Sequence, residues 1–579
     1  MFLYLKEIGL DICPALIGAV SWMFSGYVMV WFEFEIIPIL ALSLPASCYF
    51  IERWFKKRTR FNALCLTSAM AVSITSGFAH VIIYQFLFIG VYVVYRYFLP
   101  EKKGSASCRI TKVDLGNLGL ALLLGLCISA TFITSHLSML DTSQRQGFGF
   151  EELYRQTGKL PLKYLITFIF PDFFGNPVSN IVFTPRPEGS QPYNNYNELC
   201  IYTGILSLFL SIICLPYLFT KKHVPFFLLS AVILLSMSMG SFLYYPLMKF
   251  IPGLNLSTPT RILYLFSFSF SVLAAFGADI LLTLEKKQKW LIFILWSLIP
   301  LAAVSISFFV QTVPGIKWAL EPAIQTNQGQ VYGIFREYFA PWSLVMFKPL
   351  ILIFVSFLFL TLTLFSSKKR SKTLFLILSI GVLSYDLISF GLSYNTQSPV
   401  SLAFPPTDAI RFLQKDTSKY RVLPYGKFMH NSFSPFGIED IGGYSSFYPK
   451  RYGEFLHLSQ KGIAAPLPDR FNRWIFFEKF DSPLLNLINT KYVLLPPSYS
   501  AQTPKFRLVY DKEIKIYENM DAFPRVFFVP EYQFCGSREE AYQAIGICTN
   551  SDLKQKVFLE SLPPADFRVE KNLMKQKYQ

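Results

Sequence analysis

Two acidic residues, Glu33 and Glu35, lie close together in the segment WFEFE. Carboxylate oxygens are the ligands that hard divalent cations prefer, and a carboxylate can also act as a general base. The pair could therefore hold a Mg or Mn ion, the one cofactor that the sequence indicates. A solvated turn between two helices explains the same residues without any chemistry, and both interpretations stay open.

Two side chains are candidates for binding a phosphate group. His80 follows the turn SGFA, and Arg261 follows the segment STPT. The arginine guanidinium matches phosphate geometry, and a histidine ring nitrogen can donate a hydrogen bond to a phosphate oxygen. The alternatives are a capping role for His80 and a plain lipid-headgroup anchor for Arg261.

Three further carboxylates, Asp141, Asp172 and Glu198, lie along one long polar segment. A carboxylate near an acceptor hydroxyl could deprotonate it as a general base. Asp172 follows a proline and also fits a simple turn. Glu198 precedes an apolar helix, where a carboxylate stabilises the helix N-terminus. These three residues are the catalytic candidates, because no GxGxxG, Walker, HExxH or GxSxG motif occurs in the chain.

The scaffold that positions these residues must face lipid. Hydrophobic residues make up 52% of the 579 residues and charged residues only 16%, whereas soluble domains carry about 25% charged residues. A bilayer-spanning helix needs about 20 mostly apolar residues, and about eleven runs fit. These runs are 11–31, 34–51, 61–77, 80–98, 115–137, 199–219, 224–243, 261–283, 290–310, 343–365 and 373–391. We therefore predict a polytopic α-helical membrane protein.

The basic residues predict its orientation. The net charge is +17, and cytoplasmic loops of membrane proteins collect Lys and Arg. Five basic clusters alternate with the apolar runs, at 53–60, 101–112, 220–223, 285–289 and 366–372. If all five are inside, the N-terminus is inside, and residues 392–579 and the long loops 138–198, 244–260 and 311–342 are outside. No basic patch with spaced aromatic residues indicates a nucleic-acid partner.

Residues 1–391 form the predicted transmembrane domain, and residues 392–579 have the charge balance of a soluble domain. Helices are expected at 407–416 and 537–547, which predicts a small α+β domain outside the membrane. Strands are expected at 420–426, 491–496, 506–519 with a hairpin turn at Asp511–Glu513, and 524–532. Cys535 and Cys548 could form a disulfide in an oxidising compartment.

Two carboxylates, Asp279 and Asp386, lie inside apolar runs. Ionisable residues within a membrane are costly and tend to be functional. Asp279 is near the inner end of its run and within reach of Lys286 and Lys287, so the alternative is that its side chain extends to water there. Asp386 is near the outer end of its run and could join an interface with the C-terminal domain.

Six segments of the chain form a recognisable ordered set. They are PDFFGNP (171–177), NYNELCIYTGILSLFL (195–210), STPTRILYLFSFSFSVLAAFGADILL (257–282), GIEDIGGYSSFYPKRYGEF (437–455), SPLLNLINTKYVLL (482–495) and IYENMDAFPRVFFV (516–529). By this set the chain resembles the bacterial YfhO family of multi-pass membrane proteins, and the resemblance covers about residues 10–530.

This family is similar to the GT-C glycosyltransferase superfamily. The resemblance implies a cell-envelope hexosyltransferase on the outer face of the bacterial cytoplasmic membrane. Its donor would be a polyprenyl-phosphate-linked sugar and its acceptor an envelope polymer or lipid. Family members begin with an earlier helix and a long first outer loop that carries an acidic motif, and this chain is expected to lack both. The alternative is therefore a non-catalytic membrane scaffold or a flippase-like handler of lipid-linked sugars.

Overall fold

The computed structural model divides the chain into two compact units. Met1–Ile133 and Gly149–Gln397 form the first, which we call the helical unit, and Thr134–Phe148 and Ser398–Gln579 form the second, the strand-bearing unit. The structure describes residues 1–34, 36–98, 111–144, 158–179, 181–182, 195–251, 253–254, 257–320, 328–425, 431–445, 447–468 and 471–562, without the side chains of 140–141, 181–182 and 328–332.

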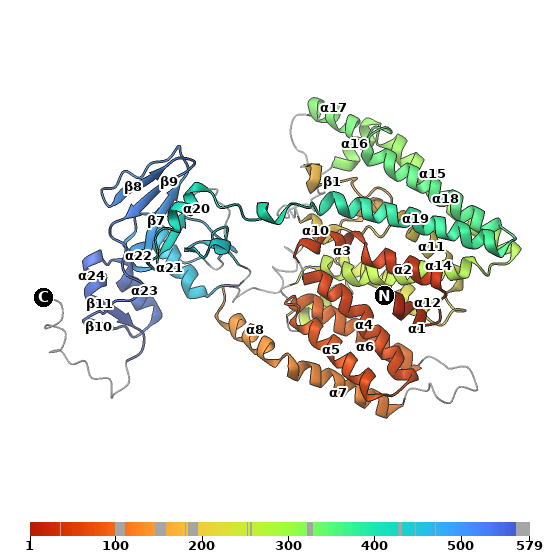
Figure 1. Ribbon diagram of the computed structural model, residues 1–579, viewed down its shortest axis with the longest axis horizontal. Helices are drawn as coiled ribbons and strands as arrows, with labels where there is room; N and C mark the ends of the chain where they lie inside the picture. Colours follow the sequence, from red (N-terminus) through yellow and green to blue (C-terminus); the bar gives the residue numbers. More distant parts are fainter. Residues whose placement is uncertain are drawn as a thin grey trace. The chain divides into compact units, whose positions relative to one another are not determined.

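The helical unit contains, within its described part, seven segments that are long and apolar enough to cross a membrane. Two of the segments are each made of two helical elements that follow one another in the chain. The seven are α2 with α3 (Ile12–Met23 and Gly26–Val30), α4 (Ile36–Lys56), α6 (Ala79–Phe98), η7 with α14 (Pro259–Ile262 and Leu263–Leu281), α15 (Lys286–Phe309), α18 (Leu344–Phe365) and α19 (Lys369–Tyr394). The chain is thus a mainly helical protein with several apolar segments suited to a membrane (Figure 1).

The number of spans differs from the expected eleven. The run 115–137 is a broken helix, in which α7 (Lys112–Ile128) is followed by α8 (Ala130–Thr142) at a bend of 64°. If the bent pair is taken as one span, it is the eighth. Shorter helices replace the other three runs: α5 (Arg60–Thr75), α11 (Ile205–Ile213) and α12 (Val224–Ser238). Hydropathy detects apolar runs, but it does not detect where a helix breaks inside one.

α14 is the buried centre of this unit. It packs against α2, α11 and α12, and nearly all of its side chains are buried. Gly277 allows the closest approach, because a Cβ atom there would lie 1.9 Å from the carbonyl oxygen of Leu210 on α11. In contrast, α15 and α18 expose large apolar side chains such as Leu301 and Phe354, as expected for a lipid-facing surface.

Short elements connect the long helices of the helical unit. They are α1 (Phe2–Glu7), η1 (Phe32–Phe34), η3 (Leu162–Phe168), β1 (Gly175–Asn176), η4 (Pro177–Ser179), β2 (Ile181–Val182), α10 (Tyr196–Leu199), η5 (Leu215–Tyr217), α13 (Tyr244–Phe250), α16 (Val313–Leu320) and α17 (Gln328–Tyr338). β1 and β2 pair antiparallel.

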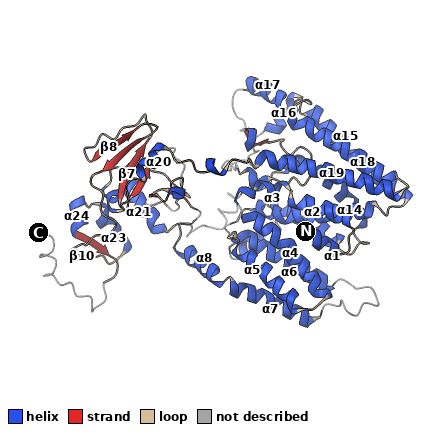
Figure 2. Ribbon diagram, viewed as in Figure 1, coloured by secondary structure: helices blue, strands red, loops and turns tan. Residues whose placement is uncertain are grey.

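The strand-bearing unit contains a five-stranded mixed sheet in the order β4-β3-β7-β9-β8 (Figure 2). β3 (Arg421–Pro424) pairs parallel with β4 (Glu439–Asp440) and with β7 (Thr490–Leu495). β9 (Lys515–Asn519) pairs antiparallel with β7 and with β8 (Phe506–Asp511). The expected strands at 420–426, 491–496 and 506–519 are therefore confirmed, as is the hairpin.

The remaining elements of this unit are helices and short strand pairs. They are η8 (Val400–Leu402), α20 (Asp408–Leu413), η9 (Ser434–Phe436), β5 (Gly443–Tyr444), α21 (Lys450–Lys461), β6 (Trp474–Ile475), α22 (Pro483–Leu487), β10 (Glu531–Phe534), α23 (Arg538–Gly546), α24 (Asn550–Gln555) and β11 (Lys556–Leu559). α20 and α23 confirm the two expected helices. The strand expected at 524–532 is wrong for its first part, since β10 begins only at Glu531 after two prolines. Cys535 and Cys548 are free thiols.

Candidate functional site

A buried ion pair joins two segments that meet at one end of the helical unit. Arg261 lies on η7, which begins with Pro259 and leads into α14, and Glu198 lies on the short helix α10. The Nε and Nη2 groups of Arg261 donate to Oε1 of Glu198 at 3.1 and 2.9 Å. The two side chains are only 11% and 3% exposed. Both charges are therefore largely removed from water.

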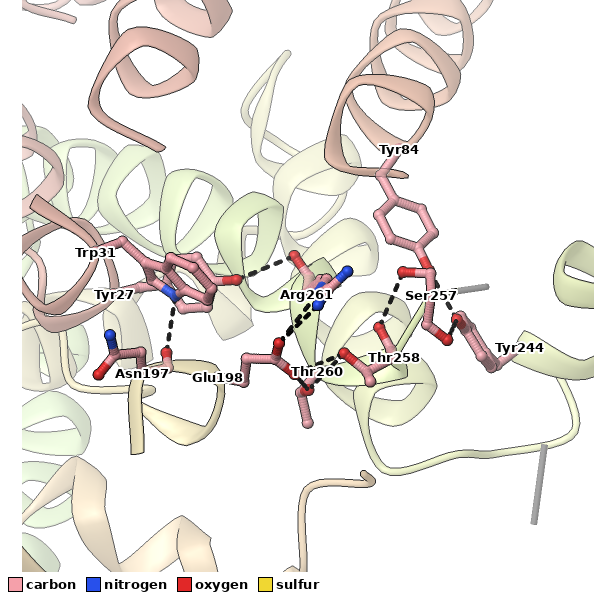
Figure 3. A network of polar contacts seen from close by, with 10 residues as sticks. All are labelled: Tyr27, Trp31, Tyr84, Asn197, Glu198, Tyr244, Ser257, Thr258, Thr260 and Arg261. Carbon is pink, nitrogen blue, oxygen red and sulfur yellow. Dashed lines mark hydrogen bonds and ion pairs between the residues drawn. The ribbon is translucent and has the colours of Figure 1, made fainter. Parts of the chain in front are cut away.

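Two threonines complete the contacts of Glu198. The hydroxyls of Thr258 and Thr260 donate to Oε2 at 2.7 and 3.3 Å, so both carboxylate oxygens are engaged (Figure 3). These contacts hold the carboxylate at a fixed position beside Arg261.

Aromatic residues surround this ion pair, and we call the whole group the Arg261 cluster. The guanidinium of Arg261 lies over the ring of Phe78 at 4.7 Å, and its carbonyl accepts a hydrogen bond from Tyr27 at 3.5 Å. Trp31 donates to the carbonyl of Asn197, the neighbour of Glu198, at 2.9 Å. Among the described residues, Nη1 of Arg261 has no hydrogen-bond partner. One edge of the guanidinium is thus still able to bind an anion.

A chain of hydroxyl groups extends the cluster toward α6 and α13. Tyr84 and Tyr244 share a hydrogen bond of 2.7 Å, and Tyr84 donates to Ser257 at 3.2 Å (Figure 3). His80, one turn before Tyr84 on α6, contacts the carbonyl of Gly253 through Nδ1 at 3.2 Å. The ring of Phe78 lies against His80 as well as under Arg261. The two residues expected to bind phosphate are therefore neighbours of the same aromatic ring.

Asp172 lies outside the Arg261 cluster, in the turn that precedes β1. It lies in a turn where Gly175 donates to its carbonyl and where Asn176 donates to its carboxylate at 2.9 Å. Burial raises the pKa of Asp172, which lies outside the membrane-spanning segments, above its ordinary value. Its charge is within electrostatic reach of Tyr196 on α10 and of Lys348 on α18. The structure thus places Asp172 near α10 but in no direct contact with Arg261.

Of the other expected site residues, the structure describes only the side chain of Glu33, which forms no hydrogen bond or ion pair with the described residues of the cluster. Glu33 is exposed on η1 and is within electrostatic reach of Tyr394, whose hydroxyl donates to Asn197. Glu35 lies outside the described residues. Asp141 lies on α8, and its side chain is also outside the described part. In the described ranges, no group of three or more His, Cys, Asp or Glu side chains could hold a metal ion.

The structure also assigns partners to the two carboxylates that lie inside apolar runs. Asp386 is buried on α19 and accepts hydrogen bonds from the Tyr202 hydroxyl at 2.5 Å and from the Ile205 amide at 3.0 Å. Asp279 pairs with Lys221 at 3.3 Å, and not with Lys286 or Lys287 as expected from sequence proximity. Folding brings the turn before α12 to the end of α14, which a linear reading does not reveal.

Sequence reasoning missed the tyrosines and threonines of the cluster. Tyr27, Tyr84 and Tyr244 lie on three separate helices, and nothing in the local sequence distinguishes them from membrane-interface tyrosines. Thr258 and Thr260 flank the proline that precedes Arg261, so the segment STPTR was the available signal. No protein-family model, no curated protein and no solved structure matches the chain.

Proposed function

We propose that the chain is a YfhO-like membrane glycosyltransferase of the GT-C type, in which the Arg261 cluster binds the phosphate of a polyprenyl-phosphate-linked sugar. The observation that carries the proposal is the hydrogen bonding of the Arg261 guanidinium. Its Nε and Nη2 groups donate to Glu198, whereas its Nη1 group has no hydrogen-bond partner among the described residues. A fixed guanidinium edge suits a phosphate oxygen, because its planar donors match phosphate geometry. The resemblance of the surrounding STPTR and NYNEL segments to the family supports the same assignment.

An apolar cavity supports a lipid-linked donor. A space of about 750 Å³ lies beside η3 and α15, lined mainly by apolar side chains that include Leu162, Ile306 and Trp318. Phe168, at the end of η3, packs against Phe266 of α14, the helix that follows Arg261. A polyprenyl chain could lie in this cavity, since burial of apolar surface is favourable. Lys163 also lines the cavity, and its Nζ donates to the carbonyl of Trp318.

The proposed transfer needs a base and a stabilised leaving group. The oxygen of an acceptor hydroxyl would attack the anomeric carbon of the sugar, and its proton would go to a carboxylate. The bond between that carbon and the phosphate oxygen would break, with the electron pair leaving on the phosphate beside Arg261. Asp172 is our candidate base, because a raised pKa brings a carboxylate closer to the operating pH. We interpret Glu198 as the residue that positions Arg261.

The proposal also includes an orientation. The Arg261 cluster lies at the start of α6 and α14. At the other end of these helices, Arg96 is on the last turn of α6, and Lys221, from the turn before α12, pairs with Asp279 near the end of α14. Because positive residues favour the cytoplasmic side, we place the cluster at the outer face of a bacterial cytoplasmic membrane. The envelope polymer or lipid acceptor would approach from that side.

A second function, handling of lipid-linked sugars without transfer, is favoured by one observation. Glu198 is fully occupied by Arg261 and two threonines, so the pair could recognise a phosphate without taking part in chemistry. Such a protein would bind or translocate the donor, and the acceptor would play no part.

Transfer from a polyprenyl-phosphate hexose tests the proposal. Purified protein in liposomes is given radiolabelled donors and an envelope extract as acceptor. We expect Arg261→Lys to lower kcat/KM by about 100-fold, as for loss of one charge-stabilising donor, and Asp172→Asn to lower kcat. Arg336→Lys, on an exposed position of α17, is the control. Unchanged transfer in both site variants contradicts the assignment of Arg261 and Asp172 to the site. If the unmodified protein binds the donor but transfers no sugar, the second function, handling of lipid-linked sugars, is supported.

A further inference from the structure

A pocket of about 170 Å³ lies in the strand-bearing unit, between α21 and the segment 471–478 that contains β6. Ligand pockets combine apolar and aromatic walls with a few polar groups that fix the orientation of the ligand. This pocket has the same composition, with rings from Tyr448, Phe471, Trp474 and Phe476 and polar side chains from both walls. Its described lining residues all belong to this unit, whereas the Arg261 cluster belongs to the helical unit. The pocket is therefore a feature of the strand-bearing unit alone.

Exposed aromatic rings form part of the pocket lining. Trp474 and Phe476 are 43% and 55% exposed, although both are large apolar side chains. Their ring planes are nearly parallel, with an angle of 14° and a distance of 6.0 Å between the ring centroids. Tyr444, the partner of Trp474 in the β5–β6 pair, packs against it with 4.6 Å between the centroids. Exposed apolar surface that is gathered in this way marks an interaction site.

His457 contributes a polar atom that the described part of the chain does not use. It lies on α21 and lines the pocket, and its Nε2 is buried without a hydrogen-bond partner among the described residues. Its ring contacts Phe471 edge to face, with 6.4 Å between the centroids. A buried polar atom without a partner calls for an explanation. A hydroxyl group both donates and accepts, so a ligand hydroxyl can satisfy Nε2 in either tautomer of the ring.

The wall that carries the aromatic rings is fixed to α21. The side-chain oxygen of Gln460 accepts from the backbone amides of Glu478 and Lys479, both at 2.9 Å, and its Nε2 donates to the carbonyl of Lys479 at 2.9 Å. The hydroxyl of Tyr448 donates to the carbonyl of Asn472 at 2.8 Å. These contacts hold both ends of the segment in place before a ligand arrives, which lowers the entropic cost of binding.

The remaining polar groups of the lining suit an uncharged ligand. Lys461 and Glu478, the lysine and the acid of the described lining, pair with each other at 2.5 Å. Oδ1 of Asn472 accepts from the backbone amide of Trp474 at 3.2 Å, which leaves its Nδ2 group as a donor. A nucleic acid requires basic groups along its backbone, and the described lysine is already engaged by a carboxylate. Aromatic surface and single hydrogen-bonding groups therefore remain as the means of recognition.

We propose that this pocket binds an oligosaccharide of neutral sugars. A sugar ring presents an apolar face of C–H groups, and this face matches the exposed rings of Trp474 and Phe476. The hydroxyl groups around its rim match Nε2 of His457 and the amide of Asn472. Binding requires neither Arg261 nor a lipid-linked donor. Envelope polysaccharides are the source of such a chain if the unit lies outside the membrane, and that identification alone rests on the proposed function.

Isothermal titration calorimetry of the full-length protein in nanodiscs tests the site, because nanodiscs avoid detergents with sugar headgroups. The probes are hexasaccharides of α-linked glucose, β-linked glucose, mannose and N-acetylglucosamine, and we expect saturable binding of at least one. Trp474→Ala should weaken this binding about tenfold, as for loss of one stacked ring. His457→Ala should weaken it about fivefold, as for loss of one hydrogen bond. Trp474→Phe keeps a ring and should retain most of the affinity.

Control variants complete the experiment. Phe476→Ala tests the aromatic surface a second time, and the thermal unfolding midpoint shows whether each variant is folded. Trp342→Ala and His136→Ala remove an exposed tryptophan and a histidine outside the pocket, and both should bind like the unmodified protein. Binding of none of the hexasaccharides, or binding that Trp474→Ala and Phe476→Ala leave unchanged, would overturn the proposal.

Two further probes test other classes of ligand. Single-stranded nucleic acids and proline-rich peptides also dock against aromatic side chains, so an oligothymidylate and a proline-rich peptide are titrated in the same way. We expect neither to bind. Binding of either one in place of the sugars, lost in Trp474→Ala, would assign the pocket to that class and contradict the proposal. Because the readout is binding and not transfer, a negative transfer assay does not affect the result.

Discussion

Arg261 and Glu198 form an ion pair in which one carboxylate oxygen receives both guanidinium bonds and the other receives two threonine hydroxyls. The pair connects η7 to α10, two elements that are far apart in the sequence. It therefore connects the stability of this end of the bundle to the geometry of the proposed phosphate site.

Replacing only one residue of this pair should lower the free energy of unfolding more than replacing both residues does. Glu198→Gln or Arg261→Met alone leaves one buried group uncompensated, and we expect a loss of about 3–5 kcal/mol in the free energy of unfolding. The double variant should lose clearly less than the sum of the two. Equilibrium unfolding of the full chain in detergent measures the four stabilities.

The exposed pair Arg411–Asp408 is the matched control, because both of its side chains are more than half exposed. Its removal should change stability by less than about 1 kcal/mol. Additive losses for Arg261 and Glu198 would mean that the two charges do not depend on one another.

Gly277→Ala should disrupt the packing of α14 on α11. A methyl group at Gly277 would lie 1.9 Å from the carbonyl oxygen of Leu210, so the helices would have to separate. We expect a loss of roughly 3 kcal/mol or more in unfolding free energy, at or above the usual range for overpacking. Gly381→Ala on α19 is the control, since no atom lies within 4 Å of its added Cβ, and it should be neutral or slightly stabilising. Equal effects of the two changes would contradict the close approach.

The strand-bearing unit should become less stable as the pH rises through the titration of Asp440. Burial raises the pKa of this carboxyl to about 6 from an ordinary value of 3.8, and its Oδ2 is buried without a hydrogen-bond partner in the described part of the chain. The folded state therefore holds the proton more tightly than the unfolded state does. The stabilisation is complete below about pH 4 and is lost as the pH rises through about 6.

Asp440→Asn removes this titration. We expect the variant to exceed the unmodified protein by about 1–2 kcal/mol at pH 7–8 and to match it near pH 4. Hydrogen exchange of the amides in β3 and β4, followed against pH, measures the difference in the full chain. A constant difference at every pH would show that another effect of the amide is responsible.

The orientation makes a direct prediction for fusion proteins. With the basic clusters inside, a green fluorescent protein fused after residue 579 should not fluoresce, and alkaline phosphatase fused there should be active. A fusion after Lys289, in a basic cluster, should give the opposite result. Fluorescence at the C-terminus would place the strand-bearing unit in the cytoplasm, and the proposed outer-face sugar site would have to be abandoned.

The sequence determined the apolar helical segments and the local elements of this protein. Apolar composition and run length act locally and additively, so α4, α6, α15, α18 and α19 follow from them. The content of Val, Ile, Tyr and Phe in 491–496 and 506–519 likewise predicts β7, β8 and β9. The same reasoning selected Glu198, Arg261 and His80 one by one, from residue type and position.

Only the tertiary structure decided which of these residues meet. The pairing of Arg261 with Glu198 and that of Asp279 with Lys221 join segments distant in the chain. Hydropathy also did not reveal that three apolar runs form shorter helices or that α7 and α8 meet at a bend. Burial, ion pairing and pKa depend on what surrounds a group in space, and that environment is created by packing rather than by neighbours in sequence.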